Sequence, residues 1–114
     1  MSDCIFCKIA AGEIGKLIYE DEITAAFDDL GPQAPIHFLV IPKKHIARLS
    51  DICDGTDADL LGHMMVVANK IAKNKGIAEE GYRTVINCNE GAGQSVWHIH
   101  CHVLGGRKLN WPPG

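Results

Sequence analysis

Three histidines near the C-terminal end of the chain alternate with apolar residues, at His98, His100 and His102. Successive side chains of a β-strand point to opposite faces, so a strand would place the three imidazoles on one face and the residues between them on the core face. Same-face positions lie about 6.6 Å apart, which spreads the row over roughly 13 Å. A row of that length leaves room for imidazoles with different chemical roles.

A glycine-containing loop at residues 91–93 precedes this row and is followed by Ser95. Main-chain N–H groups around Gly93, together with the Ser95 hydroxyl, can hold phosphate oxygens. Neutral imidazole is a nucleophile and a general acid or base near pH 7, and a second histidine can protonate a departing group. The combination predicts phosphoryl chemistry. The alternative is that the histidines are ordinary polar residues on an edge strand.

Two cysteines near the N-terminus, Cys4 and Cys7, have the Cys-x-x-Cys spacing that can hold a metal through two thiolates. Two histidines would complete a tetrahedral shell. The alternative is a pair of reduced thiols on a short helix. The chain has five cysteines, and this odd number argues against a secreted disulfide framework. We therefore expect free or metal-bound thiols in a reducing compartment.

Several short strands and one long helix are expected to position these residues. Apolar residues at helical spacing predict a helix at about residues 57–75, with Thr56 as its N-cap and Gly76 as its stop. A short helix is predicted at residues 4–11. Alternating or continuous apolar runs predict strands at residues 17–20, 23–27, 37–41, 82–87 and 96–104. This pattern is typical of an α+β domain with a mainly antiparallel sheet.

Length and composition exclude several classes of protein. The 114 residues, of which 46% are hydrophobic, predict a single domain over residues 1–114. The formal net charge of −3 gives no basic footprint for nucleic acid or an anionic membrane surface. No apolar run approaches the roughly 18 residues needed to span a bilayer. The first residues lack the pattern of a signal peptide, so we expect a cytoplasmic protein without a membrane partner.

The chain resembles the histidine triad (HIT) superfamily, through a stretch that matches the signature His-φ-His-φ-His-φ-φ. Residues 29–35, 37–45, 81–83 and 111–114 also resemble the Hint branch, the nucleoside phosphoramidases. The resemblance implies an α+β fold with a five-stranded antiparallel sheet, one long helix and one short helix. It also implies a homodimer with a ten-stranded sheet, in which Trp111 lies near the partner's active site. The stretch that carries the signature is Gln94-Ser95-Val96-Trp97-His98-Ile99-His100-Cys101-His102-Val103-Leu104-Gly105-Gly106-Arg107.

The resemblance implies a role for each histidine of the row. His100 would be the nucleophile that takes the AMP group, and His102 would contact the phosphate and the leaving group. His98 would orient His100 through its main-chain carbonyl, and His37 would complete the cluster from a neighbouring strand. Trp97 stands where many relatives have tyrosine, and we expect it in packing rather than in chemistry.

The resemblance also implies a nucleotide pocket and a metal site. Asp29 would bind the ribose hydroxyls, and Leu30 would line the purine pocket with Ile18 and Phe27. The ribose and phosphate side would be held by Asn87, Gly93, Gln94 and Ser95. Some relatives bind structural zinc, and the corresponding residues here are Cys4, Cys7, His45 and His98.

The implied activity is cleavage of purine nucleoside 5′-phosphoramidates, such as AMP-amines and AMP-lysine, and of acyl-adenylates. An adenosine 5′-monophosphoramidase of this kind uses a covalent nucleotidyl-histidine and needs no cofactor for the chemistry. Three alternatives remain open: a dinucleoside polyphosphate hydrolase, a zinc hydrolase with the three histidines as ligands, and a nucleotide-binding regulatory module. The Trp-Pro-Pro-Gly end at residues 111–114 argues against the first, and the strained geometry of one straight strand against the second.

Overall fold

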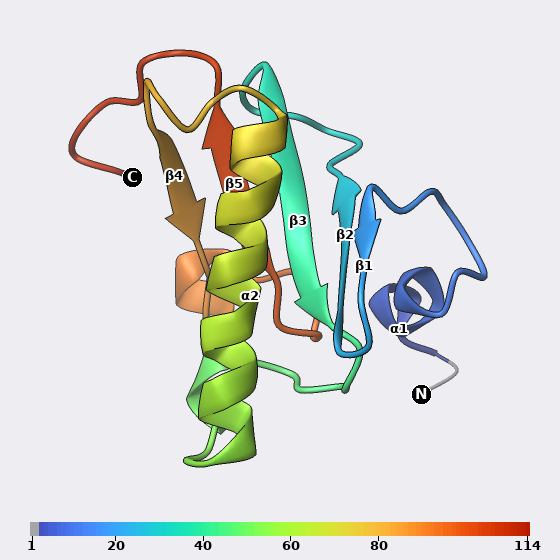
Figure 1. Cartoon of the computed structure of the whole chain (residues 1–114). Helices are drawn as coiled ribbons and strands as arrows, with labels where there is room; N and C mark the ends of the chain where they lie inside the picture. Colours follow the sequence, from blue (N-terminus) through green and yellow to red (C-terminus); the bar gives the residue numbers. More distant parts are fainter. Residues whose placement is uncertain (1–2) are drawn as a thin grey trace.

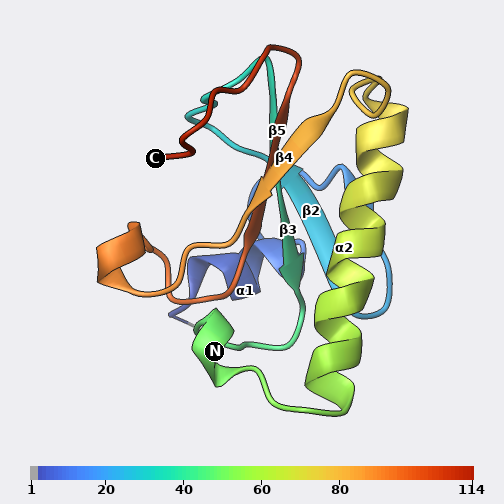
Figure 2. The ribbon, with the colours of Figure 1, turned by 90° about the vertical axis from the view of Figure 1, so that its left-hand side faces the viewer.

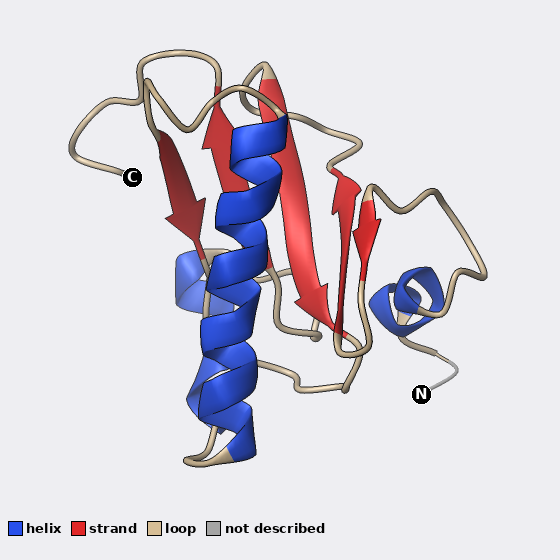
Figure 3. Cartoon of the chain, in the orientation of Figure 1, coloured by secondary structure: helices blue, strands red, loops and turns tan. Residues whose placement is uncertain are grey.

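Five strands form one antiparallel sheet in the order β1–β2–β3–β5–β4, so β3 and β5 lie in its interior (Figure 1). The computed structural model describes residues 3–114. With two helices, the sheet confirms the predicted α+β fold (Figure 3). The elements are α1 (Ile5–Ala10), β1 (Tyr19–Glu20), β2 (Thr24–Asp28), β3 (Ile36–Pro42), η1 (Leu49–Asp51), α2 (Thr56–Asn74), β4 (Tyr82–Val85), η2 (Glu90–Ala92) and β5 (Cys101–Gly105).

The two helices cover opposite faces of the sheet (Figure 2). Alternation along β2 and β3 decides which residues face which helix. The core under α2 contains Ala26, Phe38, Val40, Met64, Val67, Ala68, Ile71, Ala72, Cys101 and Val103. The smaller core under α1 contains Phe6, Ala10, Ala25, Phe27, Leu39 and Ile41. Since α1 is much shorter than α2, its face of the sheet is only partly covered.

The register of β3 against β5 brings two histidines together on the α1 face. Leu39 lies opposite His102, and His37 lies opposite Leu104. His37 and His102 are therefore diagonal neighbours on the same face, which is within reach of their rings. The sheet alone thus assembles part of the histidine cluster.

The predicted strand at residues 96–104 is wrong in its first half, because β5 begins only at Cys101. The preceding segment leaves the sheet: the amide of Ile99 donates to the carbonyl of Ile46 at 2.7 Å, and Ile99 packs with Ile46 and Leu60. Ile99, Cys101 and Val103 are nevertheless all buried in core clusters. His98 and His100 consequently sit on irregular backbone, where their rings can point in different directions.

Helix boundaries differ from prediction at one end of α2. The N-cap is Gly55, with a φ of 79°, and Thr56 is already the first helical residue. A positive φ favours glycine, which explains why the predicted threonine cap is displaced by one position. At the other end Gly76, with a φ of 79°, follows the C-cap Lys75 as predicted. None of the helices described within residues 3–114 meets the length and hydrophobicity that a bilayer-spanning segment requires.

Candidate active site

A cleft of about 710 Å³ opens on the α1 face of the sheet, where the short helix leaves it uncovered. Nine of the predicted pocket residues line it: Ile18, Phe27, Asp29, Leu30, Asn87, Gly93, Ser95, His100 and His102. Apolar residues from α1 add a wall that the sequence did not predict: Ile5, Phe6 and Ile9. Pockets of this size and mixed lining accept small molecules such as a nucleotide.

The ring of His100 is held by the main chain of His98, two residues earlier. Its Nδ1 lies 2.8 Å from the carbonyl oxygen of His98, and a carbonyl can only accept. His100 therefore carries its proton on Nδ1, which leaves the lone pair of Nε2 free in the neutral ring. The ring of Phe6 packs against the same ring in a T-shaped contact, with the centroids 5.1 Å apart. His100 is buried and oriented, with a nucleophilic nitrogen available in the cleft it lines.

His102 lies beside His100, with ring centroids 5.0 Å apart. Its Nδ1 is 2.9 Å from Nε2 of His37, which sits behind it and does not itself line the cleft. Burial lowers the pKa of His102 to about 4, reinforced by His100 and His37 and opposed by the carboxylate of Asp29. The ring of His102 is therefore neutral near pH 7.

Asp29 stands at the edge of the cleft, between the main chain and the histidines. Its Oδ1 accepts the amide of Gly31 at 2.8 Å, while Oδ2 lies 3.4 Å from Nε2 of His37 and 3.9 Å from Nδ1 of His102. The side chain remains partly exposed, and the neighbouring Leu30 is fully exposed. A carboxylate so placed still has acceptor sites for hydroxyl groups.

Two residues of the signature stretch, Gln94 and Trp97, lie outside the lining of the cleft. Gln94 does not line the cleft: its buried amide donates to the carbonyls of Ala47 and Val96 at 2.8 and 3.0 Å and accepts the amide of Asn89. Its side chain ties the loop together. Trp97 does not line the cleft either and is 46% exposed. The guanidinium of Arg48 lies 5.7 Å from its ring centroid, a distance typical of a cation–π contact.

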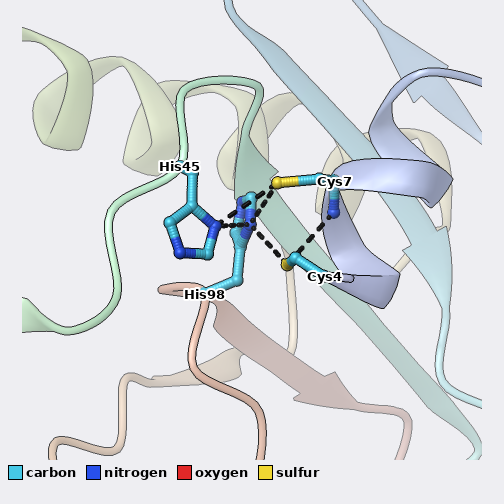
Figure 4. Close-up of side chains that lie close together, drawn as sticks. All are labelled: Cys4, Cys7, His45 and His98. Atoms are coloured by element: carbon cyan, nitrogen blue, oxygen red, sulfur yellow. Dashed lines mark hydrogen bonds between the residues drawn. The ribbon is translucent and has the colours of Figure 1, made fainter. Parts of the chain in front are cut away.

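The four predicted metal ligands converge at the N-terminal end of α1, although they come from three distant segments (Figure 4). Nδ1 of His98 lies 3.3 Å from Sγ of Cys4, 3.5 Å from Sγ of Cys7 and 3.3 Å from Nδ1 of His45. Sγ of Cys7 is also 3.3 Å from Nδ1 of His45. All four donor atoms lie within 4.8 Å of one another.

The chemistry of these donors fits a tetrahedral zinc. Bonds of about 2.3 Å to sulfur and 2.0–2.1 Å to nitrogen imply donor separations of roughly 3.3–3.8 Å, close to those observed. Nε2 of His98 lies 2.8 Å from the carbonyl of Pro42, so the proton is on Nε2 and the lone pair of Nδ1 faces the thiols. Burial lowers the pKa of His98 to about 4, partly offset by the Pro42 carbonyl. The ring is therefore neutral near pH 7, as a metal ligand must be.

The sequence missed the residues that support the histidines from behind. The amide of Gln33 donates to Nδ1 of His37 at 3.0 Å, and a main-chain donor leaves no mark on residue type. Phe6 could have been found, because Phe6, Ile9 and Ala10 have the i, i+3, i+4 spacing of an amphipathic helix.

Comparison with known proteins gives one consistent family. The model of the HIT domain family matches residues 13–109. A HIT-like protein of Synechococcus elongatus is 50% identical over 113 residues, covering 98% of this chain and 97% of that protein. A HIT family hydrolase from Legionella pneumophila, known from its crystal structure, has 52% sequence identity to this chain. The two structures superpose with a TM-score of 0.94, over 98% of this chain and 100% of that one. A histidine triad protein from Clostridium difficile is 51% identical, with a TM-score of 0.92 and 96% of both chains covered.

Proposed function

This chain belongs to the HIT domain family, and we propose that it is a hydrolase that cleaves the P–N bond of purine nucleoside 5′-phosphoramidates through a nucleotidyl-histidine. Proteins of this family bind nucleotides, and a similar solved structure is a HIT family hydrolase. The finer proposal is an adenosine 5′-monophosphoramidase acting on AMP-amines, AMP-lysine and acyl-adenylates. One observation carries it: the hydrogen bond from His100 to the carbonyl of His98 leaves Nε2 as a free nucleophile.

The cleft suggests how the nucleotide binds. The purine would lie against the apolar side chains of Ile18, Phe27 and Leu30. The ribose hydroxyls would donate to the carboxylate of Asp29. The phosphate would then reach His100, with the hydroxyl of Ser95 on the loop side.

In the first step the lone pair of His100 Nε2 forms a bond to phosphorus, and the P–N bond breaks with its electron pair passing to the departing nitrogen. That nitrogen takes up a proton from the solvent and leaves as an amine. The attacking ring becomes a phosphorylated imidazolium, whose Nδ1–H stays bonded to the carbonyl of His98. The neighbouring His102 lies where it can donate to the phosphate or the leaving group.

In the second step water attacks phosphorus on the nucleotidyl group, and the bond to His100 breaks. The oxygen of water ends on AMP, and its proton replaces the one that the amine took up. The balance is one phosphoramidate and one water consumed, and one amine and one AMP produced. The chemistry needs no cofactor, because imidazoles supply both the nucleophile and the hydrogen-bond donor.

We propose that Cys4, Cys7, His45 and His98 hold a zinc ion. A closed shell of four protein donors leaves no open position for substrate, so the ion would stabilise the fold and not activate water. It would tie the N-terminal segment to the sheet and steady His98. The zinc-hydrolase alternative is disfavoured, because Nδ1 of His98 faces the thiols while Nδ1 of His100 is bonded to a carbonyl. Their rings do not converge on one ion.

We also propose that the chain forms a homodimer and is located in the cytoplasm. A homodimer would pair β4, an edge strand of the described sheet, with its copy in a ten-stranded sheet and bring Trp111 near the partner's cleft. Trp111 is 79% exposed, which suits a residue that a partner covers. A cytoplasmic location agrees with reduced cysteines.

Turnover measurements separate the candidate functions. Wild-type protein should release AMP from an AMP-amine much faster than it cleaves a diadenosine polyphosphate, and His100→Ala should abolish both. Preference for the diadenosine compound would favour the dinucleoside polyphosphate hydrolase. AMP binding with no turnover of either compound would favour the regulatory nucleotide-binding module.

A further inference from the structure

A chain of hydrogen bonds that begins outside the cleft fixes the ring proton of His37. The main-chain amide of Gln33 lies 3.0 Å from Nδ1 of His37. An amide nitrogen can only donate, so Nδ1 of His37 is the acceptor. The neutral ring of His37 must therefore carry its proton on the other nitrogen, Nε2.

The proton position of His37 in turn fixes that of His102. Nε2 of His37 lies 2.9 Å from Nδ1 of His102, and two N–H groups cannot face each other at that distance. Nδ1 of His102 therefore accepts, and the proton of His102 is on Nε2. The carboxylate of Asp29, 3.4 Å from Nε2 of His37, is a second acceptor for the same proton and leaves this assignment unchanged.

We propose that Gln33 is a positioning residue: its main-chain amide, acting through His37, holds His102 as a neutral ring that presents a fixed Nε2–H to the substrate phosphate. The role in turnover rests on the proposed function, whereas the proton positions do not. A donor already aimed at developing negative charge lowers the barrier without reorganisation.

The two cleft histidines thereby become complementary. His100 bonds a carbonyl through Nδ1 and offers a lone pair at Nε2, while His102 accepts through Nδ1 and offers an N–H at Nε2. One ring is fixed as the attacking group and the other as the donor. His102 then acts by hydrogen bonding and stays neutral. A second proton on its Nδ1 would force the proton of His37 from Nε2 to Nδ1, and the hydrogen bond from the Gln33 amide would break.

The Gln33 segment is anchored to the end of β5. The guanidinium of Arg107 donates to the carbonyl of Gln33 at 2.9 Å, and the side-chain amide of Gln33 donates to the carbonyl of Gly31 at 3.0 Å. Gly106, with a φ of 91°, lets the two segments approach, since a Cβ there would lie 2.9 Å from Cβ of Pro35. Arg107 is therefore a second positioning residue, because it holds the main chain of Gln33 in place through the carbonyl of that residue.

The direct test is nitrogen-15 NMR of the histidine rings in the wild-type protein at neutral pH, without ligand. Long-range couplings distinguish a protonated ring nitrogen from an unprotonated one. We expect His37 and His102 to be protonated on Nε2 and His100 on Nδ1. A proton on Nδ1 of His102 would overturn the proposal, whatever the activity of the protein.

A matched pair of variants tests the source of the constraint. Gln33→Pro removes the amide donor, whereas Gln33→Ala removes the side chain and keeps the amide. Gln33→Pro should give a mixture of tautomers at His37 and His102 and lower kcat by about tenfold or more, with a smaller change in KM. Gln33→Ala should keep the wild-type tautomers. Unchanged tautomers in folded Gln33→Pro would refute the role of the amide.

Arg107→Met provides a second route if Gln33→Pro does not fold. Loss of the bond to the Gln33 carbonyl should give a mixture of His102 tautomers, and addition of guanidinium should shift the mixture back. A single wild-type tautomer in Arg107→Met would remove Arg107 from the proposal. Failure of the proposed function is seen separately, as wild-type protein that has the expected tautomers but forms no AMP adduct.

Discussion

His98 and His100 are joined by a hydrogen bond of 2.8 Å between the carbonyl oxygen of the first and Nδ1 of the second. The ring of the same His98 points the other way, toward Cys4 and Cys7. One residue therefore links the thiol cluster to the proposed nucleophile. The link runs through the backbone, so the cluster can steady the nucleophile without taking part in the reaction.

The purified protein should contain about one zinc per chain. Cys7→Ser should lose the metal and at least about 2.7 kcal/mol of stability, the linkage expected for a site saturated 100-fold above its Kd. Metal analysis and thermal unfolding measure both effects. Cys53→Ser is the matched control, because Cys53 is an exposed thiol outside the cluster. Equal metal content in both variants would exclude the cluster as the zinc site.

Asp29→Asn should weaken nucleotide binding without disturbing the loop. Asparagine keeps the Oδ1 acceptor for the amide of Gly31 and loses the charge that favours ribose hydroxyls. We expect KM to rise about tenfold, which corresponds to about 1.4 kcal/mol. The difference between variant and wild type should vanish with a substrate that lacks both ribose hydroxyls. A difference that persists with that substrate would mean that Asp29 acts elsewhere.

Asp21 should make stability fall in acid. Burial favours a raised pKa for Asp21, but hydrogen bonds from His63 at 2.7 Å and from the amides of Ile23 and Thr24 outweigh it and hold the pKa well below its usual range. Since the folded pKa lies below the unfolded value of about 3.9, this stabilisation is present above about pH 4 and is lost as the pH falls further.

Denaturant unfolding between pH 7 and pH 2 measures this contribution. Asp21→Asn should be about 1 kcal/mol less stable than wild type at pH 7, and the gap should narrow toward pH 2. Asp54→Asn, at an exposed position, serves as the control. A gap for Asp21→Asn that stays constant over the whole range would show that the carboxylate charge does not contribute.

Two glycine substitutions should change stability in opposite directions. A Cβ on Gly105 would lie 2.7 Å from Cδ1 of Ile77, so Gly105→Ala should destabilise by about 1–3 kcal/mol. Gly62 is exposed within α2, with nothing within 4 Å of an added Cβ, so Gly62→Ala should stabilise by about 0.5–1 kcal/mol. Thermal unfolding checks both. A stable Gly105→Ala would show that Ile77 can move aside.

The sequence predicted most of the fold because its periodic patterns are local. The helix at residues 56–74 and the strand around Phe38 both follow from apolar spacing. The exit of residues 96–100 from the sheet did not, because it depends on Ile99 packing with Ile46 and Leu60, which lie far away in the chain. Tertiary packing there overrides a local strand pattern.

The candidate site was predictable where residue type carries the chemistry. Histidines, cysteines and Asp29 were found because their side chains stand out, and the structure brings them together as two neighbouring clusters. Gln94 was placed in the pocket although its amide is buried in a loop network. The amide of Gln33 could not be foreseen, since any residue except proline supplies that donor.

The most direct test of the proposed chemistry is mass spectrometry of the wild-type protein quenched during turnover of an AMP-amine. We predict a chain heavier by the mass of AMP minus one water, with the modified peptide mapping to His100. His100→Ala under the same conditions should show no added mass. An adduct on another residue, or rapid AMP release with no adduct at any quench time, would contradict the assignment of His100 as the nucleophile.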